Sequence, residues 1–240
     1  MSNDSGPARA SMPAMSLLEF ARGPGLAFAL VVFFAGMAIR LRATLRPGAP
    51  DLSAPRSNAV LAGAWQAIRR RMLPRGAYGA PGRAATLNAL VWHLGLLVVV
   101  LAFAPHIEFV RRLTGLAWPA LPDVVTYLAT ALTLGGLLIA LVLRWTDPVL
   151  RLLSNFDDWF SWFVTTLPLL TGMALIEQVY VPAPPYAPTH AADPALLAVH
   201  LLSLELLLVW LPFGKLAHAV LAFVSRARTG AAFARKGAAQ

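Results

Sequence analysis

The chain has 240 residues, of which 58% are hydrophobic and only 13% are charged, and its formal net charge is +9. A mean hydropathy of +0.65 is too high for a soluble domain and indicates an integral membrane protein. The absence of cysteine excludes disulfides, thiolate metal sites, iron–sulfur clusters and thiol-linked haem within the chain. The arginines gather between apolar runs, so the charge indicates membrane orientation rather than a nucleic-acid partner.

Apolar runs long enough to cross the hydrocarbon core, which takes about 20 helical residues, recur along the chain. The N-terminal residues lack the basic region and cleavage site of a secretory signal, so the first run is expected to remain as a span. The sequence predicts an all-α integral membrane bundle of five transmembrane helices, at residues 24–41, 85–109, 124–143, 159–179 and 194–224.

The distribution of Lys and Arg predicts how the bundle is oriented. Both residues accumulate in the loop 42–84 and in the tail 225–240, whereas the loop between the last two runs has neither. Loop and tail are therefore expected in the cytoplasm, with the N-terminus outside and the C-terminus inside. Within the loop, WQAIRRRML at 65–73 predicts a short amphipathic interfacial helix that serves either as a docking surface or as a lipid-headgroup contact.

Histidine is concentrated in two of the apolar runs. His93 and His106 belong to the second run, and His200 and His218 to the fifth. Ionisable groups at membrane depth are costly and usually functional. On a continuous helix the eighteen residues from His200 to His218 make about 5.0 turns, which places both side chains on one face about 27 Å apart. One metal ion cannot reach both, so two sites at different depths are expected.

The second and fifth runs are antiparallel in the predicted topology. Depth therefore pairs His93 with His218 near the cytoplasm and His106 with His200 near the outer side. Two imidazoles from facing helices at one depth are the axial arrangement of a b-type haem held without cysteine. A histidine proton relay in a transporter is the alternative for the same residues, and a cofactor-free membrane anchor is a third possibility.

The spacing of the two histidines in the second run does not place them on one face of a helix. The thirteen residues from His93 to His106 place them about 140° apart on an ideal helix. Pro105 removes a helical hydrogen bond just before His106, which permits the end of the helix to bend or unwind.

Three segments of the apolar runs and their flanks have a distinctive sequence: WHLGLL at 92–97, RWTDPVLRLLSNFDDW at 144–159 and HLLSLELLLVWLPFGKLAH at 200–218. They resemble the gamma subunit family of respiratory nitrate reductase. This superfamily includes the membrane cytochrome subunits of complexes associated with dissimilatory sulfite reductase and with heterodisulfide-reductase-like proteins. Ala104 and Pro105 before His106, where the nitrate-reductase subunit has glycine and a shorter histidine spacing, favour those latter branches.

The resemblance implies a multi-pass dihaem cytochrome b of the bacterial cytoplasmic membrane. His93 and His218 would ligate the iron of the cytoplasm-proximal haem b, and His106 and His200 that of the distal haem b. Quinol would be oxidised near the distal haem, or quinone reduced if electrons flow in reverse. The implied cytoplasmic partners are an iron–sulfur electron-transfer subunit and a catalytic subunit.

The resemblance leaves the quinone site open. The quinol-site lysine of the nitrate enzyme has no clear counterpart, and Arg111 and Arg112 in that region are expected to contact lipid headgroups. Glu108 and Arg112 are the candidates for this site, with a solvated interfacial carboxylate as the alternative for Glu108. Glu205 is expected to be a satisfied structural carboxyl, with proton transfer as the alternative.

Two further expectations concern the ends of the last two runs. His190, in the proline-rich outer loop, has no histidine at its own depth and is expected to be exposed to solvent. Polar residues that precede the fourth run are expected to cap its first amides, without a chemical role. These are Asn155, Asp157 and Asp158.

Overall fold

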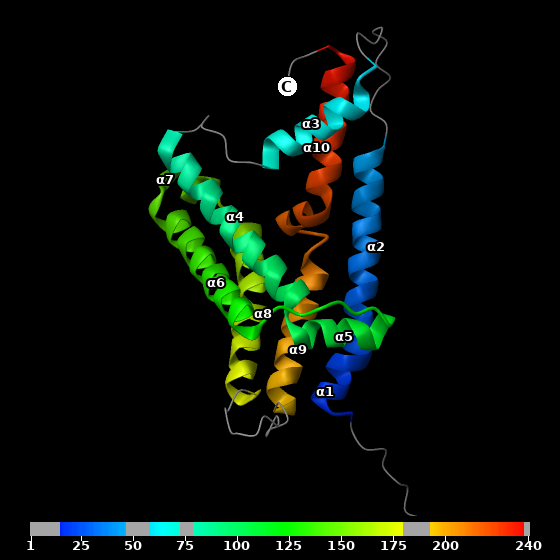
Figure 1. Ribbon diagram of the computed structural model, residues 1–240, viewed down its shortest axis with the longest axis vertical. Helices are drawn as coiled ribbons and strands as arrows, with labels where there is room; N and C mark the ends of the chain where they lie inside the picture. Colours follow the sequence, from blue (N-terminus) through cyan, green and yellow to red (C-terminus); the bar gives the residue numbers. More distant parts are fainter. Residues whose placement is uncertain (1–14, 47–57, 73–78, 180–192, 238–240) are drawn as a thin grey trace, which may run out of the picture.

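The computed structural model describes residues 15–46, 58–72, 79–179 and 193–237, and the regular elements in those ranges are helices (Figure 1). Their bounds are α1 Leu17–Phe20, the π-helical turn η1 Ala21–Gly25, α2 Leu26–Leu45, α3 Val60–Met72, α4 Gly79–Ala102, α5 Ala104–Thr114, α6 Asp123–Thr146, α7 Pro148–Leu153, α8 Phe156–Val179, α9 Pro194–Trp210, the 3₁₀ turn η3 Lys215–Ala217 and α10 His218–Arg235.

Several of these helices are long and apolar, which indicates a multi-pass integral membrane protein. Leu17–Leu45, Gly82–Ala102 and Asp123–Thr146 have the length and composition to cross a membrane, and the bent pair of α9 and α10 would make a fourth span. The prediction of five spans is therefore confirmed in part, since the described residues contain three candidate spans, or four if the bent pair counts as one. Over its described residues α8 is less apolar than the other long helices, because threonines, tryptophans and a proline interrupt its aliphatic residues.

The long helices alternate in direction along the vertical of Figure 1. Helices α2, α6 and the α9–α10 pair rise, α4 and α8 descend, and α5 lies across them. Helix α1 lies at the lower end, and the end of α10 lies at the upper end beside α3. We refer to these as the lower and upper ends below.

The second predicted span, 85–109, ends earlier than expected. Helix α4 stops at Ala102, Phe103 is extended (φ −80°, ψ 127°), and α5 begins with Pro105 in its first turn. Proline has no N–H to donate, so it is tolerated at the start of a new helix but not inside a continuous one. His106 therefore belongs to the separate crosswise helix α5, and the angle expected between His93 and His106 on one helix does not apply.

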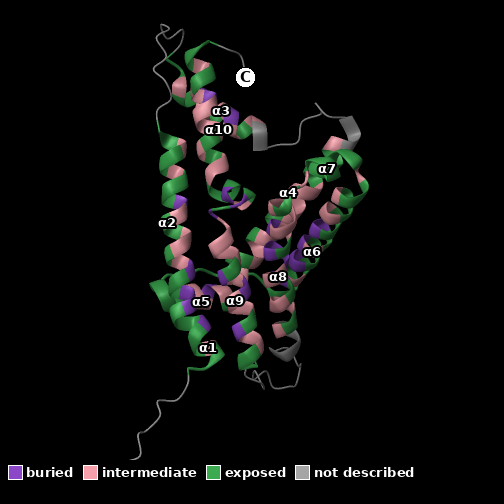
Figure 2. Ribbon diagram, turned by 180° about the vertical axis from the view of Figure 1, so that it is seen from behind, coloured by how far each residue is buried: buried purple, intermediate pink, exposed green. Residues whose placement is uncertain are grey.

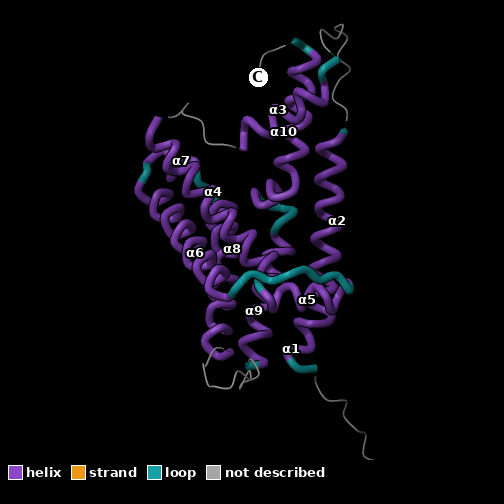
Figure 3. Tube along the Cα trace, viewed as in Figure 1, coloured by secondary structure: helices purple, strands orange, loops and turns teal. Residues whose placement is uncertain are grey.

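The fifth predicted span, 194–224, is also broken. Helix α9 ends at Trp210, and the chain resumes as η3 and α10 after an 82° bend, drawn as a loop in the middle of Figure 3. Pro212 and Gly214 lie in the break, and a Cβ at Gly214 would lie 2.5 Å from Asp157 Oδ1. The expectation that His200 and His218 share one helix face is thus wrong.

Helix ends differ from the predicted spans elsewhere too. The first span begins at Leu17 rather than at residue 24, because Pro24 is accommodated in the widened π-helical turn η1. The predicted tail 225–240 is helical as far as Arg235. Helix α3 lies inside the predicted loop 42–84 and contains most of the expected amphipathic helix.

Small residues bring α4 and α6 together. The buried residues of α6 recur at helical spacing on one face (Figure 2), and Gly136 on that face lies against α4. Asn88 Nδ2 donates to Gly136 O at 2.9 Å. A Cβ at Gly136 would lie 2.8 Å from Trp92 Cβ, so the helices approach too closely for a side chain there.

Glycines also join α3 to α10 at the upper end. A Cβ at Gly230 would lie 2.3 Å from Gly63 O and 2.5 Å from Ala67 Cβ. Arg228 Nη2 donates to Arg46 O at 2.9 Å, which ties α10 to the end of α2 as well. The cytoplasmic loop and tail expected from the sequence are therefore packed against each other.

The neighbouring glycines of α6 provide a matched test of this packing. Gly136→Ala is expected to lower the thermal unfolding midpoint, because the new methyl group overpacks the α4–α6 contact at a cost of about 1–3 kcal/mol. A Cβ at Gly135 meets nothing within 4 Å, so Gly135→Ala should leave the midpoint unchanged or raise it through helix propensity. Thermal scans of the detergent-solubilised variants measure both, and equal midpoints would contradict the packing.

Candidate functional site

The structure brings His93 of α4 next to His218, the first residue of α10. Their ring centroids are 5.9 Å apart, with an interplanar angle of 76°. His93 Nδ1 lies 2.6 Å from Ala89 O, and His218 Nδ1 lies 2.7 Å from Lys215 O. We call this the proximal pair.

The other two histidines form a second pair. The ring centroids of His106 in α5 and His200 in α9 are 6.3 Å apart, and the planes differ by only 6°. His106 Nδ1 lies 2.8 Å from Val99 O, and His200 Nδ1 lies 3.1 Å from Thr171 Oγ1. A Cβ at Gly172 would lie 3.1 Å from His200 Cε1, so the absence of a side chain there leaves room for the ring. We call this the distal pair.

The contacts of His93, His106 and His218 fix which ring nitrogen carries the proton, and the contact of His200 is compatible with the same assignment. A backbone carbonyl can only accept, so Nδ1 of His93, His106 and His218 must donate. Thr171 Oγ1 can accept from His200 Nδ1 while its own hydroxyl donates to Leu167 O at 2.9 Å. In each neutral imidazole the lone pair is then left on Nε2, which is the arrangement of a metal-ligating histidine oriented by a second hydrogen bond.

The donor set favours a metal that brings its own equatorial ligands. Among the described residues no three His, Asp or Glu side chains are grouped so as to hold a metal ion. Two imidazoles on opposite sides of one iron, with metal–nitrogen bonds of about 2 Å, have ring centroids about 6 Å apart. Both pairs have this separation. The separation in each pair is therefore compatible with a haem iron that would be held by the Nε2 atoms of the two imidazoles.

Two aspartates position the turn that precedes His218. Asp157 Oδ2 accepts from Lys215 N at 2.8 Å, and Asp158 forms ion pairs with Lys215 Nζ and, at 3.0 Å, with Arg144 Nη1. Asp158 also accepts from Asn155 N at 3.0 Å, as expected for a cap of α8. The sequence indicated only this local role, because the contacts to Lys215 join segments far apart in the chain.

Glu108 is engaged by two arginines. Arg111 Nε and Arg112 Nε lie 2.6 and 2.8 Å from its carboxylate oxygens. Hydrogen bonds from Arg111 and then Arg112 lower the pKa of Glu108 to about 2. A carboxylate held in this way is a weak base, so the geometry does not favour it as an acceptor of quinol protons.

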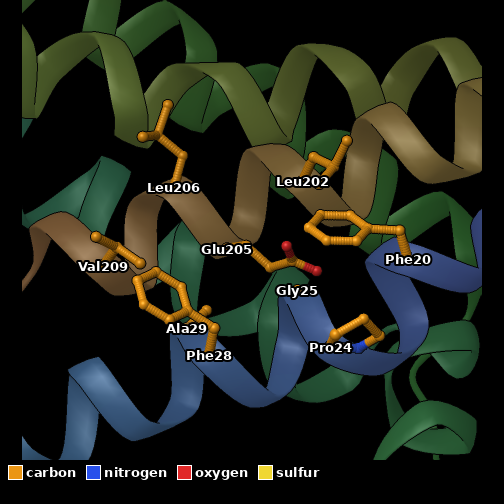
Figure 4. Close-up of a pocket in the computed structure, with 9 residues that line it drawn as sticks. All are labelled: Phe20, Pro24, Gly25, Phe28, Ala29, Leu202, Glu205, Leu206 and Val209. Carbon is orange, nitrogen blue, oxygen red and sulfur yellow. The ribbon is translucent and has the colours of Figure 1, made fainter. Parts of the chain in front are cut away.

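Glu205 of α9 differs from expectation. The residue is only 7% exposed, and within the described part of the chain its Oε1 has no hydrogen-bond partner. The prediction of a satisfied structural carboxyl is therefore wrong, because the facing parts of η1 and α2 offer apolar side chains and a glycine. The carboxyl projects into a cavity of about 500 Å³ between α9 and the start of α2 (Figure 4). The cavity is lined by Phe20, Pro24, Gly25, Phe28, Ala29, Leu202, Glu205, Leu206 and Val209.

Comparison with known proteins identifies a relative of full length. The chain is 30% identical over 226 residues to a protein from Nitratidesulfovibrio vulgaris, and the match covers 92% of this chain and 95% of the relative. The chain belongs to the same family as this protein. The relative's name, "Protein", states no activity. No protein-family model and no solved structure matches the chain.

The match to the Nitratidesulfovibrio vulgaris protein covers most of both chains, so the similarity is not confined to one motif. His190 lies outside the described residues.

Asp158→Asn tests the junction of α8 with η3. The substitution removes the charge that holds Arg144 and Lys215. Each hydrogen bond from these side chains to the carboxylate contributes at most about 1.5–3 kcal/mol, and less where the side chain is exposed to solvent. Backbone amides of residues 211–218 are expected to exchange hydrogen faster in the variant than in the wild type. Asp123→Asn, at an exposed position of α6, is the control and should leave that exchange unchanged. Equal exchange in all three proteins would show that the ion pairs do not position His218.

Proposed function

We propose that the chain is a five-span membrane cytochrome b subunit that carries electrons between the quinone pool and a cytoplasmic iron–sulfur partner through two haems b. The observation that carries this proposal is the pairing of four histidines from distant helices, each with Nδ1 engaged and Nε2 left for a ligand. The resemblance to the nitrate reductase gamma subunit family supports it.

The helix directions support the proposed topology. Five successive segments, α2, α4, α6, α8 and α9–α10, alternate in direction, so the chain begins and ends at opposite ends of the bundle (Figure 1). Most of the arginines of the described segments lie at the upper end, on the ends of α2, α6 and α10 and on α3. The upper end is then cytoplasmic and the N-terminus lies outside.

The two sites then have distinct roles. The proximal pair lies nearer the upper end, where an iron–sulfur subunit and a catalytic subunit would dock, and the distal pair lies nearer the lower end. A haem held by two imidazoles supplies a one-electron carrier and leaves no open iron position for small-molecule chemistry. The residues of this chain hold the two imidazole pairs at fixed depth and surround them with apolar helices.

Haem content and spectra of the purified chain test the proposal. We expect two b haems per chain, with a reduced-minus-oxidised spectrum typical of bis-imidazole ligation. His106→Ala and His200→Ala should each remove the same haem, and His93→Ala and His218→Ala the other, because each pair shares one iron. The double variant of His106 and His200 should lose no more haem than either single variant.

His190→Ala is the control for these variants and should retain both haems. A colourless wild-type chain would contradict the proposal and favour a histidine relay in a transporter or a cofactor-free anchor. Loss of different haems from the two members of one pair would contradict the pairing.

Thr171→Val tests the hydrogen bond that orients His200. An acceptor on Nδ1–H increases the basicity of a ligating imidazole and stabilises the more positive metal, so its removal should raise the midpoint potential of the distal haem. A net hydrogen bond of about 0.5–1.5 kcal/mol corresponds to a rise of roughly 20–60 mV for one electron. Optical redox titration of the membrane-bound protein measures the change.

Thr166→Val is the matched control on the same helix. The Thr166 hydroxyl donates to Trp162 O at 2.8 Å, and no ring nitrogen is among its hydrogen-bond partners in the described segments. The control should leave both potentials unchanged, and a rise of equal size in both variants would show that the effect does not come from His200.

A further inference from the structure

The cavity beside Glu205 combines an apolar lining with one polar group. Its walls are aromatic and aliphatic side chains from α1, η1, α2 and α9, and the Glu205 carboxyl is their single ionisable group. Gly25 and Ala29 at its base are buried, whereas Phe20 and Phe28 are 41% and 64% exposed. On the outer side of a membrane helix bundle such exposure means contact with lipid, so the cavity opens toward the bilayer.

The Glu205 carboxyl lacks what a buried polar group requires. A carboxyl removed from water costs several kcal/mol unless hydrogen bonds replace its hydration. In the described segments no donor reaches Oε1 of Glu205, although this atom is inaccessible to solvent. Because the Glu205 side chain lines the cavity, a rotation of the carboxyl toward the lumen would present this acceptor to a bound molecule (Figure 4).

The backbone of the facing segment is shaped around this carboxyl. A Cβ at Gly25 would lie 2.6 Å from Glu205 Oε2, so glycine is needed for the carboxyl to occupy its position. Gly25 ends the π-helical turn η1, which also contains Pro24 of the cavity wall. Single π-helical turns within α-helices occur frequently at functional sites.

We propose that this cavity binds the headgroup of the membrane quinol, with the Glu205 carboxyl accepting a hydrogen bond from one hydroxyl of the hydroquinone ring. This inference rests on the proposed function, because it names where the quinol of that function docks. A hydroquinone combines a flat apolar ring for Phe20 and Phe28 with a hydroxyl for Glu205, and its tail can extend into lipid through the open side. Such sites are lined mainly by apolar side chains with few polar groups that orient the ligand.

The location relates the cavity to the distal pair. Glu205 lies five residues after His200 on α9, so the two side chains are about 7.5 Å apart along the helix axis. They face different neighbours, since His200 contacts Thr171 of α8 and Glu205 faces Gly25 at the start of α2. A ligand in the cavity would therefore approach the distal pair without displacing either imidazole.

The test measures binding without turnover. The full chain is reconstituted in lipid nanodiscs and kept anaerobic with dithionite, and equilibrium binding of radiolabelled decylhydroquinone is compared with that of its dimethyl ether. Empty nanodiscs correct for partition into lipid. The ether has the same ring and tail but no hydroxyl donor, so the wild type should bind the hydroquinone roughly tenfold more tightly.

Two variants locate the site. Glu205→Leu should weaken hydroquinone binding roughly tenfold and leave ether binding unchanged, because leucine has no atom that can accept the hydrogen bond from the hydroxyl. Gly25→Ala should weaken it to a similar extent by displacing the carboxyl. Gly23→Ala is the matched control in the same turn, since a Cβ there meets nothing within 4 Å, and it should bind as the wild type does.

Equal affinity of the wild type for hydroquinone and ether would overturn the proposal, and this comparison does not depend on the folding of any variant. Unchanged binding in folded Glu205→Leu would also overturn it. Haem content, measured on the same preparations, tests the proposed function separately. Two haems with no hydroxyl preference would reject this site alone, whereas a colourless chain that prefers the hydroquinone would reject the cytochrome and keep the site.

Discussion

Peptide groups within the hydrocarbon core must find hydrogen-bond partners in the protein, and this constraint determines where the helices of this chain can break. Helix α4 ends at Ala102 and leaves its last carbonyls without intrahelical donors. Three of them are satisfied from outside the helix: Val99 O by His106 Nδ1, Leu101 O by Trp118 Nε1 and Ala102 O by Leu121 N. His106, one member of the distal pair, is therefore also a hydrogen-bond donor to the C-terminal end of α4.

The break before His218 obeys the same constraint. The amide of Lys215 donates to Asp157, and the carbonyl of Lys215 accepts from His218 Nδ1. His106 and His218 are the two histidines that follow a break. Each therefore donates from Nδ1 to a backbone carbonyl beside that break. In this protein the hydrogen bonds that satisfy carbonyls beside a helix break also orient a histidine ring, and Pro105 and Pro212 lie beside those two breaks.

The sequence predicted the helices better than their ends. Long apolar runs predicted α4, α6 and α8 because hydropathy depends on composition alone, and depth matching predicted which histidines are neighbours. The periodicity argument for His200 and His218 failed because Pro212 and Gly214 break the helix, although the pairing by depth does not need a shared face. The partners of Asp158 and the unsatisfied carboxyl of Glu205 depend on which helices touch, and a single sequence without relatives carries no signal for such contacts.

The contact between Gly63 and Gly230 has a consequence for how the protein is made. Helix α3 leaves the ribosome early, because it ends at Met72, whereas α10 begins only at His218. The face of α3 that packs on α10 has no final partner until the last helix has been synthesised. The packed form of the upper end, in which α3 lies against α10, can therefore form only after α10 has been synthesised.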